Sequence, residues 1–381
     1  MAVKLGNGNW AVKEDKLLAY NDNSGRFFNK EFDFSRGSIA TYVGKDGLIK
    51  SAASDVPRID FSDSTNGALL LEPQSTNLFP YSNDFSQWDS LSGASVINNA
   101  LVSPDGTLNA DEFVFDGTDN GRVEDPVSTT NGLVYTFSIY LKNKDIANPT
   151  QVFIGNGTTT EGEFVTITNE WQRFTTTQTA NGTSEYPRVR YNGVGSLYAY
   201  GAQIEQQSFA TSYIPTSGSA TTRLADACNN SGSAQDFNSE EGVLYAEYKI
   251  GGDSTDNFQI ITLRNTNSGS EIIGIGKQNF SNDIFIRANI GSVNLFNNLS
   301  ATPIDGYNKV AISYKSGNSS AWVNGTKVHS SSSTFTPSST IGRLSFQWEA
   351  PLTFNFYGKT KNLQVFTEAK SDEFLAALTT I

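Results

Sequence analysis

The sequence predicts an all-β protein with an irregular N-terminal anchor, two β-sandwich domains of the jelly-roll type and one short C-terminal helix. Apolar residues alternate over short runs, and Asn, Asp and Gly separate these runs, as turns between strands require. Only 17% of the 381 residues are charged, whereas 12% are aromatic. Average globular proteins carry roughly 25% charged residues. This composition indicates polar-surfaced β domains with few helices.

Changes in the sequence pattern predict three parts. Residues 1–79 hold Gly- and Asn-rich turns and no long strand pattern, so we expect an irregular segment there. Residues 80–222 contain strand runs at the spacing of a sandwich, followed by a linker, TSGSATT, at 216–222. Residues 223–381 repeat the sandwich pattern. The length also favours two or three domains, at roughly 100 to 200 residues each.

Individual elements follow from local patterns. Four strand-length runs rich in β-branched and aromatic residues are predicted as strands, at 133–141, 243–250, 283–290 and 309–314. Asn324-Gly325 stands between two short alternating runs and predicts a hairpin, because both turn positions need a positive φ. The last element, 371–378, is predicted as a helix with Ser371 as N-cap and acidic residues in its first turn.

Charge and residue counts exclude several classes of protein. The chain has 27 Lys and Arg against 39 Asp and Glu, a net charge of -12, and no basic run, so nucleic acid and membrane surfaces are not expected partners. Its single cysteine, Cys228, cannot form an internal disulfide and is expected to be buried. No apolar stretch resembles a signal peptide or a membrane span, so we expect synthesis in the cytoplasm and release by another route such as lysis.

Several longer strings stand out in the chain. In the N-terminal part they are FSRGSIATYV at 34–43, DGLI at 46–49, VPRID at 56–60 and LLLEPQSTNL at 69–78. These strings resemble a family of bacteriophage fibre, spike and adsorption-type structural proteins. The strings YGAQIE at 200–205 and ATSYIPT at 210–216 resemble the end of the carbohydrate-binding-like sandwich of that family. The strings AWVNG at 321–325 and NLQVF at 362–366 are similar to those of concanavalin A-like, laminin-G-type lectin sandwiches.

The resemblance implies a protein on the virion surface, on the head or the tail. Its lectin-like domains would attach multivalently to host or environmental glycans. The first 79 residues would bind other virion proteins of the capsid or tail, and the chain would form a homo-oligomer, as such fibres are usually homotrimers. Two alternatives stay open: a purely structural virion component that binds no sugar, and a spike that cleaves polysaccharide.

Sugar binding needs an exposed aromatic ring beside hydrogen-bonding side chains. Aromatic residues near turn residues are the candidates in both sandwiches; they are Trp88, Tyr191, Tyr198, Trp322 and Trp348. Trp171 is expected instead to cover a sandwich core, as a strand tryptophan commonly does.

Catalysis and metal binding receive little support. His329 is the only histidine and lies among serines, and the acidic strand pattern of concanavalin A-like glycanases is missing, so we expect no enzyme. No cofactor is expected. Asp116 and Asp119 could hold Ca²⁺ in the loop DGTDN at 116–120, although an Asp turn that bonds its own backbone is the commoner meaning of such a loop.

Overall fold

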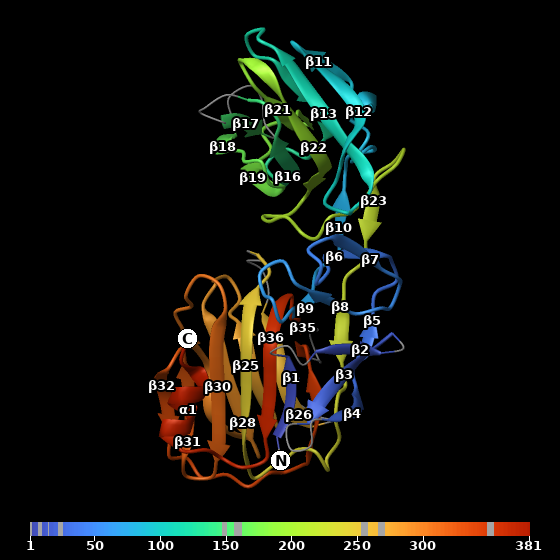
Figure 1. Ribbon diagram of the computed structural model, residues 1–381. Helices are drawn as coiled ribbons and strands as arrows, with labels where there is room; N and C mark the ends of the chain where they lie inside the picture. The colour runs from blue at the N-terminus through green and yellow to red at the C-terminus, as the bar shows by residue number, and fades with distance from the viewer. Residues whose placement is uncertain are drawn as a thin grey trace. The chain divides into compact units, whose positions relative to one another are not determined.

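The computed structural model describes residues 2–6, 10–13, 15–21, 26–146, 151–155, 162–252, 258–265, 271–348 and 354–381 (Figure 1). The chain forms two compact units. Unit 1 combines Met1–Gly37, Ala52–Pro73 and Ala225–Ile381, and unit 2 combines Ser38–Ser51 and Gln74–Leu224. Within the described residues the elements are strands, apart from one 3-10 turn and one α-helix. The predicted all-β class with a short C-terminal helix is therefore confirmed.

Residues 1–79 do not form a separate irregular part, because they are divided between the two units and contain short strands. Within unit 1, β1 (Ala2–Gly6) and β9 (Ala68–Leu71) both pair with β36 (Gly358–Phe366). The sequence pattern missed these two strands because they have only five and four residues and pair with β36 almost 300 residues or more away. The binding of other virion proteins by this segment stays a prediction.

Unit 2 is a sandwich of two five-stranded antiparallel sheets, counted over the described residues. We call them the arginine sheet and the hollow sheet, after features described below. The arginine sheet has the order β11 (Ser90–Ser92), β14 (Arg122–Glu124), β21 (Arg188–Arg190), β17 (Gln151–Gly155), β18 (Glu163–Thr166). The hollow sheet has the order β12 (Ala94–Val102), β13 (Leu108–Asp116), β22 (Val194–Glu205), β16 (Val134–Asn143), β19 (Gln172–Thr179).

Alternation along the strands places one face of each sheet of unit 2 in a shared core. The arginine sheet contributes Val123, Ile154 and Val189, and the hollow sheet contributes Phe113 and Leu197, all fully buried in one cluster. The neighbouring residues on the same strands consequently face outward. Three short pairs complete the unit: β6 (Ala40–Val43) with β7 (Ile49–Ala52), β10 (Ser75–Asn77) with β23 (Thr221–Arg223), and β15 (Val127–Ser128) with β20 (Ser184–Glu185). The predicted linker 216–222 thus ends inside a strand.

Unit 1 contains a large sheet and a five-stranded sheet. The path of the large sheet is β2 (Ala11–Lys13), β3 (Lys16–Asn21), β1, β36, β25 (Glu241–Ile250), β30 (Asn308–Lys315), β31 (Ser319–Val323), β32 (Thr326–Ser331), with β4 (Arg26–Glu31), β8 (Arg58–Asp60) and β9 attached at its side. The five-stranded sheet has the order β29 (Val293–Ala301), β28 (Ile284–Ile290), β27 (Ile272–Lys277), β26 (Gln259–Asn265), β33 (Ile341–Ser345). Two short pairs lie beside them: β5 (Asp33–Ser35) with β24 (Ala227–Asn229), and β34 (Gln347–Trp348) with β35 (Phe354–Asn355).

The core of unit 1 lies between these two sheets. Ile312 and Leu363 of the large sheet share a buried cluster with Ile261 and Ile275 of the five-stranded sheet. The helix α1 (Asp372–Thr379) contacts β30 and β31 on the large sheet (Figure 1). Its Leu375 belongs to a second small cluster. One sandwich core and one helix-covered face therefore account for the apolar pattern of 223–381.

Several local predictions are confirmed. The predicted strands correspond to β16, β25, β28 and β30. Asn324 and Gly325 have φ values of 48° and 84° between β31 and β32, as the predicted hairpin requires. The Ser371 side chain accepts a hydrogen bond from the backbone N–H of Phe374 and caps α1. Cys228 is buried in the core of unit 1.

A buried ion-pair network occupies unit 1, and the conspicuous N-terminal strings supply most of it. Arg36 Nη1 lies 3.1 Å from Asp226 Oδ1, and Arg58 Nη2 lies 2.6 Å from Asp226 Oδ2. Arg58 Nη1 also lies 2.7 Å from Glu72 Oε2. Burial opposes the charge of Arg58, but Asp226 and Glu72 raise the pKa of its guanidinium. These four side chains, which we call the buried tetrad, balance two positive with two negative charges.

A second buried network lies in unit 2 and joins the end of the string at 69–78 to two further strings. Glu205 accepts hydrogen bonds from Ser75 Oγ at 2.6 Å and from Gln203 Nε2 at 2.6 Å. It also accepts from the backbone N–H of Thr211 at 3.0 Å. Asn77 donates to the carbonyl oxygen of Ile214 at 2.9 Å. The strings at 69–78, 200–205 and 210–216 therefore bond one another inside the fold.

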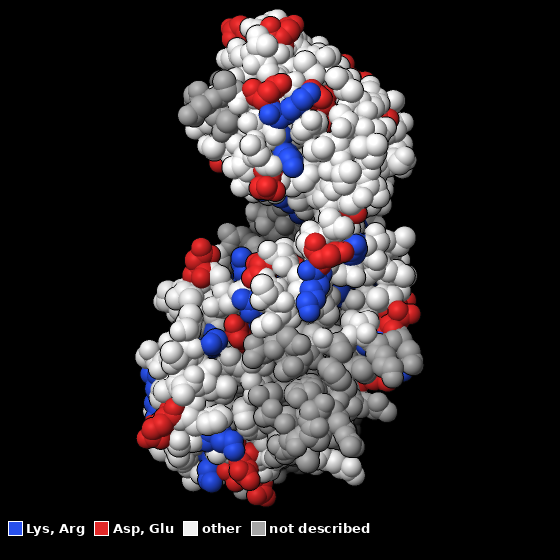
Figure 2. All heavy atoms as spheres, viewed as in Figure 1, with Lys and Arg blue, Asp and Glu red and all other residues white. Residues whose placement is uncertain are grey.

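Charged side chains are dispersed on the surface. Figure 2 shows Lys and Arg in small groups among Asp, Glu and uncharged residues, without a broad basic area among the described residues of that face. Among the residues that the structure describes, no helix is both long enough and apolar enough to cross a membrane.

Candidate functional site

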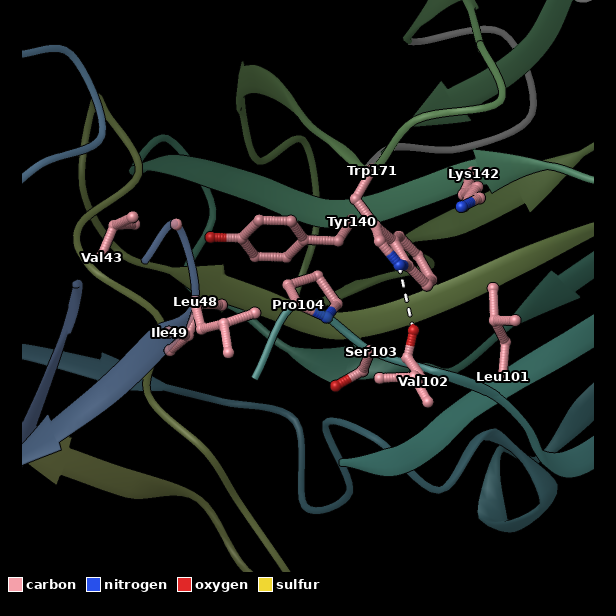
Figure 3. Close-up of a pocket in the computed structure, with 11 residues that line it drawn as sticks. Val43, Leu48, Ile49, Leu101, Val102, Ser103, Pro104, Tyr140, Lys142 and Trp171 are labelled. Atoms are coloured by element: carbon pink, nitrogen blue, oxygen red, sulfur yellow. Dashed lines mark hydrogen bonds between the residues drawn. The ribbon is translucent and has the colours of Figure 1, made fainter. Parts of the chain in front are cut away.

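Unit 2 carries a hollow of about 410 Å³ beside the outer face of the hollow sheet (Figure 3). Four chain segments line it: the β6–β7 hairpin, the end of β12 with the turn after it, β16, and the residue before β19. The lining residues are Val43, Gly47, Leu48, Ile49, Leu101, Val102, Ser103, Pro104, Tyr140, Lys142 and Trp171. Most of them are apolar, and Lys142 is the only one among them with a charged side chain.

Trp171 forms one wall of the hollow. It is half-buried, and its indole Nε1 donates a hydrogen bond to the backbone oxygen of Val102 at 3.2 Å, drawn as the dashed line in Figure 3. This bond fixes the edge of the ring to the end of β12. The prediction that Trp171 covers the sandwich core is therefore wrong: the tryptophan lies outside the main core of unit 2 and packs beside a small cluster around Tyr200 and Tyr213.

Tyr140 and Lys142 reach the hollow because of the alternation of β16. Ile139 and Leu141 are fully buried in the core, so Tyr140 and Lys142 point to the opposite face. The guanidinium of Arg173 lies 5.5 Å from the centre of the Tyr140 ring. Within the described residues the structure gives no ion pair for the Lys142 ammonium and no hydrogen-bond partner for the Tyr140 hydroxyl. Both polar groups are thus available at the hollow.

The turn after β12 is held by Asp105. Its carboxylate accepts hydrogen bonds from Thr107 N at 2.8 Å, Ser103 Oγ at 2.8 Å and Tyr200 Oη at 3.0 Å. Burial works against the charged form, but the hydrogen bonds from Thr107, Asn109 and Ser103 lower the pKa of Asp105 to about 2. Ile49 N also donates to Pro104 O at 2.9 Å, which connects β7 to the same turn. The rim of the hollow is therefore preorganised.

Tyr198 is the sequence-predicted candidate that the structure brings next to this site. It is the direct cross-strand partner of Lys142 and is half-buried on the same outer face. The ammonium of Lys144 lies 5.9 Å from its ring centre and is held by Glu112 at 2.7 Å. Tyr198 thus extends the aromatic surface beside the hollow, although it does not line the hollow itself.

Two predicted tryptophans are buried and cannot present a ring to a ligand. Trp88 is 4% exposed, because the turn that ends at this residue places its ring against those of Phe79 and Phe85. The ring centroids lie 4.7 Å and 4.9 Å away, respectively. Trp322 is 7% exposed and belongs to the cluster that α1 contributes to. Proximity to turn residues suggested exposure for both, but burial by a neighbouring turn or helix overrides it. Neither offers a platform for a sugar.

Tyr191 and Trp348 are half-buried and are not among the residues that line the hollow. The Tyr191 ring packs edge-on against Phe115, with centroids 5.8 Å apart. Trp348 lies in an aromatic group of unit 1, and the guanidinium of Arg287 stands 4.9 Å from its ring centre. Part of each ring is therefore covered by neighbouring side chains of the same fold.

The candidate cation loop is organised as an Asp turn. Asp116 Oδ1 accepts a hydrogen bond from Thr118 N at 2.8 Å, and the hydrogen bonds from Thr118 lower the pKa of Asp116. Asp119 is exposed. Within the described part of the chain no cluster of three or more His, Cys, Asp and Glu side chains is arranged to hold a metal ion. Calcium binding here stays an untested prediction.

Sequence reasoning missed Tyr140, Lys142 and Trp171 as partners in one site. The alternation of Tyr140 and Lys142 with the apolar Ile139 and Leu141 was a readable signal for an outer face. The β6–β7 hairpin gave no such signal, because it reaches the hollow from about 90 residues before β16 in the chain.

No family model matches the chain, and no curated protein matches it in sequence. Solved structures give low-scoring similarities. The CBM40 of Ruminococcus gnavus IT-sialidase bound to α2,3-sialyllactose is 15% identical over 40% of this chain and 94% of that chain, with a TM-score of 0.32. Domain 4 of AbnA, a GH43 arabinanase of Geobacillus stearothermophilus in complex with arabinotriose, is 12% identical over 45% and 83%, with a TM-score of 0.32.

A third similarity, to Trypanosoma rangeli sialidase, covers 96% of this chain and 65% of that enzyme at 10% identity, with a TM-score of 0.31. All three scores lie below 0.5, so these similarities assign neither a ligand nor an activity to this chain. The class that the fold and the hollow define is an all-β protein whose unit 2 sandwich presents an aromatic surface site.

Proposed function

We propose that this protein is a non-catalytic glycan-binding protein and that the hollow of unit 2 is its sugar site. The observation that carries the proposal is the meeting of Trp171, Tyr140 and Lys142 at a hollow of about 410 Å³. A sugar ring presents an apolar face of C–H groups, which packs on an aromatic ring, and a rim of hydroxyls, which need hydrogen-bond partners. Trp171 supplies the first, and Tyr140 and Lys142 supply the second.

Binding without cleavage agrees with the chemistry of the hollow. Glycoside hydrolysis canonically needs two carboxyl groups roughly 5 to 9.5 Å apart. The residues found to line the hollow include no Asp, Glu or His. We therefore expect no release of reducing ends when the protein is incubated with a polysaccharide that it retains; such release would instead support the polysaccharide-cleaving alternative.

The direct test is a glycan microarray of bacterial surface polysaccharides, followed by calorimetric titration of the glycans retained. Trp171→Ala should weaken binding by about tenfold or more, as expected for a central aromatic contact. Tyr140→Phe and Lys142→Gln, which remove only a polar group, should each weaken binding less. A matched control is Phe280→Ala, which deletes a 74% exposed aromatic ring of unit 1 and should leave binding unchanged.

Thermal unfolding of each variant separates loss of binding from loss of fold. The proposal fails if Trp171→Ala, Tyr140→Phe and Lys142→Gln all fold normally and bind like the parent chain. It also fails if the parent chain retains no glycan at all, and the purely structural alternative then gains support.

The same proposal places the protein on a virion surface, as a head or tail fibre or decoration component that acts in several copies. This part rests on the strings at 34–43, 56–60 and 69–78, which resemble phage structural proteins. Weak sites gain avidity when several copies are held together. Immunogold labelling of particles with an antibody against 223–381 tests the location, and light scattering of the purified chain tests the expected homotrimer.

A further inference from the structure

A row of side chains crosses the arginine sheet of unit 2, opposite to the hollow sheet. The strand register makes the members direct cross-strand neighbours: Phe164 opposes Phe153, Phe153 opposes Arg190, and Arg190 opposes Arg122. We call these four residues the arginine row. Direct neighbours across antiparallel strands point to the same face of a sheet. The row therefore gathers two guanidinium groups and two aromatic rings on one face of the sheet, with Phe153 only 4% exposed.

Burial shows which face carries the row. Val123, Ile154 and Val189 occupy the alternate positions on the same strands and are fully buried in the core. The arginine row must consequently lie on the outer face. Phe164 is 65% exposed at one end and covers Phe153, with ring centroids 5.6 Å apart. The side chain of Arg122, at the other end, is 26% exposed.

The contacts of Arg190 hold its guanidinium in a defined plane without neutralising it. The group lies 4.3 Å from the centre of the Phe153 ring, and Nη1 donates to Asn120 Oδ1 at 3.0 Å. Among the described residues no carboxylate lies within ion-pair distance of Arg190. Stacking and one neutral hydrogen bond therefore orient this cation, and neither contact is with a carboxylate.

Three arginines lie close together on this face, although the whole chain carries a net charge of -12. Arg122 and Arg190 are placed directly opposite each other, an arrangement that repels. Arg188 lies on the same face, two positions from Arg190. Glu124 binds both Arg122, at 2.8 Å, and Arg188, at 3.2 Å, so one carboxylate serves two guanidinium groups.

The pKa of Arg188 responds to this arrangement. Burial lowers it, and the neighbouring Arg122 and Arg190 lower it further, while Glu124 and Glu185 oppose the change. Three arginines thus face two carboxylates. An anion placed between Arg122 and Arg190 would relieve the repulsion that the free protein carries.

We propose that the arginine row is a second ligand site that binds an anionic sugar, with Arg122 and Arg190 on its carboxylate or sulfate group and Phe164 beside its ring. The planar fork of arginine matches two oxygens of either anion. The exposed ring of Phe164 offers the apolar contact that a free inorganic anion would not use. This site is separate from the hollow and does not depend on the function proposed for it.

The test is ligand-detected saturation-transfer NMR with the full chain and three small probes: galacturonate, galactose 6-sulfate and uncharged galactose. We expect both anionic probes to bind and galactose to bind at least about tenfold more weakly, because charge-assisted hydrogen bonds are the strong ones. Binding of only one anionic probe would identify the carboxylate or the sulfate as the group recognised. Equal binding of all three probes would overturn the proposal.

Variants distinguish recognition by the row from general attraction. Arg190→Gln should lower the affinity for the anionic probes by about tenfold, and Arg190→Lys, which keeps the charge but loses the fork, should lower it nearly as much. Lys370→Gln removes one positive charge from unit 1 and serves as the matched control, with unchanged affinity expected.

Phe164→Ala should weaken the binding of the anionic sugars while leaving the binding of methyl sulfate and acetate unchanged. If Arg190→Lys binds like the parent chain, the row acts only as a point of positive charge and the proposal is wrong. Circular dichroism of each variant verifies the fold. Because Trp171→Ala leaves the row intact, a loss of anion binding in that variant would also contradict a separate site.

Discussion

Two groups of arginines in this molecule differ in how their charge is met. In the buried tetrad of unit 1, Arg36 and Arg58 have no exposed side-chain surface and bind Asp226 and Glu72. In the arginine row of unit 2, Arg122 is 26% exposed and shares one carboxylate with Arg188, while Arg190 stacks on Phe153. The tetrad balances its charges inside the fold. The row leaves positive charge at the surface, where a ligand can meet it.

The comparison also distinguishes residues that belong to a recognisable sequence motif from residues that form a surface site. The strings that resemble phage proteins contain Arg36, Arg58, Glu72 and Asn77, and all four side chains are buried in polar networks. The row lies outside these strings, whereas Val43 and residues 47–49, from the strings at 34–43 and 46–49, line part of the hollow. The buried charged residues of the strings are explained by structural constraint, since a buried charge tolerates no unpaired partner.

The largest expected effect comes from breaking the tetrad. Asp226→Asn removes the carboxylate that binds both Arg36 and Arg58, so we expect the free energy of unfolding to fall by about 3 to 5 kcal/mol. Urea unfolding of the full chain measures the change, and hydrogen exchange of β8 and β9 shows whether it arises in unit 1.

The control for this change is Lys16→Gln, which breaks the exposed pair of Lys16 with Glu31 in the same unit. Exposed pairs contribute little to stability, so its unfolding midpoint should not move measurably. If Asp226→Asn is as stable as this control, the tetrad does not hold unit 1 together and the contrast with the row disappears.

Much of the fold could be predicted from the sequence, because local chemistry determines those parts. The Asn324-Gly325 hairpin and the Ser371 cap follow from backbone preferences of a few adjacent residues. The sheet made by β1 and β36 does not, because its partners are separated by more than 350 positions. Short strands of this kind form only beside their partner strand, and a local sequence pattern cannot predict which distant strand that is.

The candidate sites were harder to predict, because exposure is decided by what else packs nearby. Trp88 and Trp322 stand beside turn residues yet are buried, while Trp171 was expected in the core and lies at the hollow. Tyr198, another candidate, lies on the outer face beside the hollow but does not line it. The arginine row was not recognised, since Arg122 and Arg190 are 68 positions apart in the chain and meet only through strand register.

An effect of intermediate size should appear in the pH dependence of the free energy of unfolding of unit 2. Burial raises the pKa of Asp111 to about 6, although its carboxylate accepts hydrogen bonds from the backbone N–H groups of Asn99 and Phe85. The native state then binds a proton that the unfolded state releases, so stability should increase as the pH falls from about 6 to about 4. Asp111→Asn should remove this increase, which we expect to be about 1 to 3 kcal/mol.

Urea unfolding at pH 7 and pH 4 measures this contribution. Asp116→Asn is the matched control, because hydrogen bonds from Thr118 lower the pKa of that exposed carboxylate. Its contribution has the opposite sign: the stability is present above the unfolded pKa and is lost as the pH falls. An Asp111→Asn variant with the same pH dependence as the parent chain would show that Asp111 is not a strained buried charge.

The smallest expected effect concerns the row itself. Arg122→Gln removes one of two opposed cations, and Glu124 keeps Arg188 as its partner, so the free energy of unfolding should change by about 1 kcal/mol or less. The same urea experiment as for Asp226→Asn measures it. A loss as large as that of Asp226→Asn would mean that the row is a structural network like the tetrad. A small change together with weaker anion binding would mean that these arginines serve the ligand, because their removal then costs recognition and leaves the fold intact.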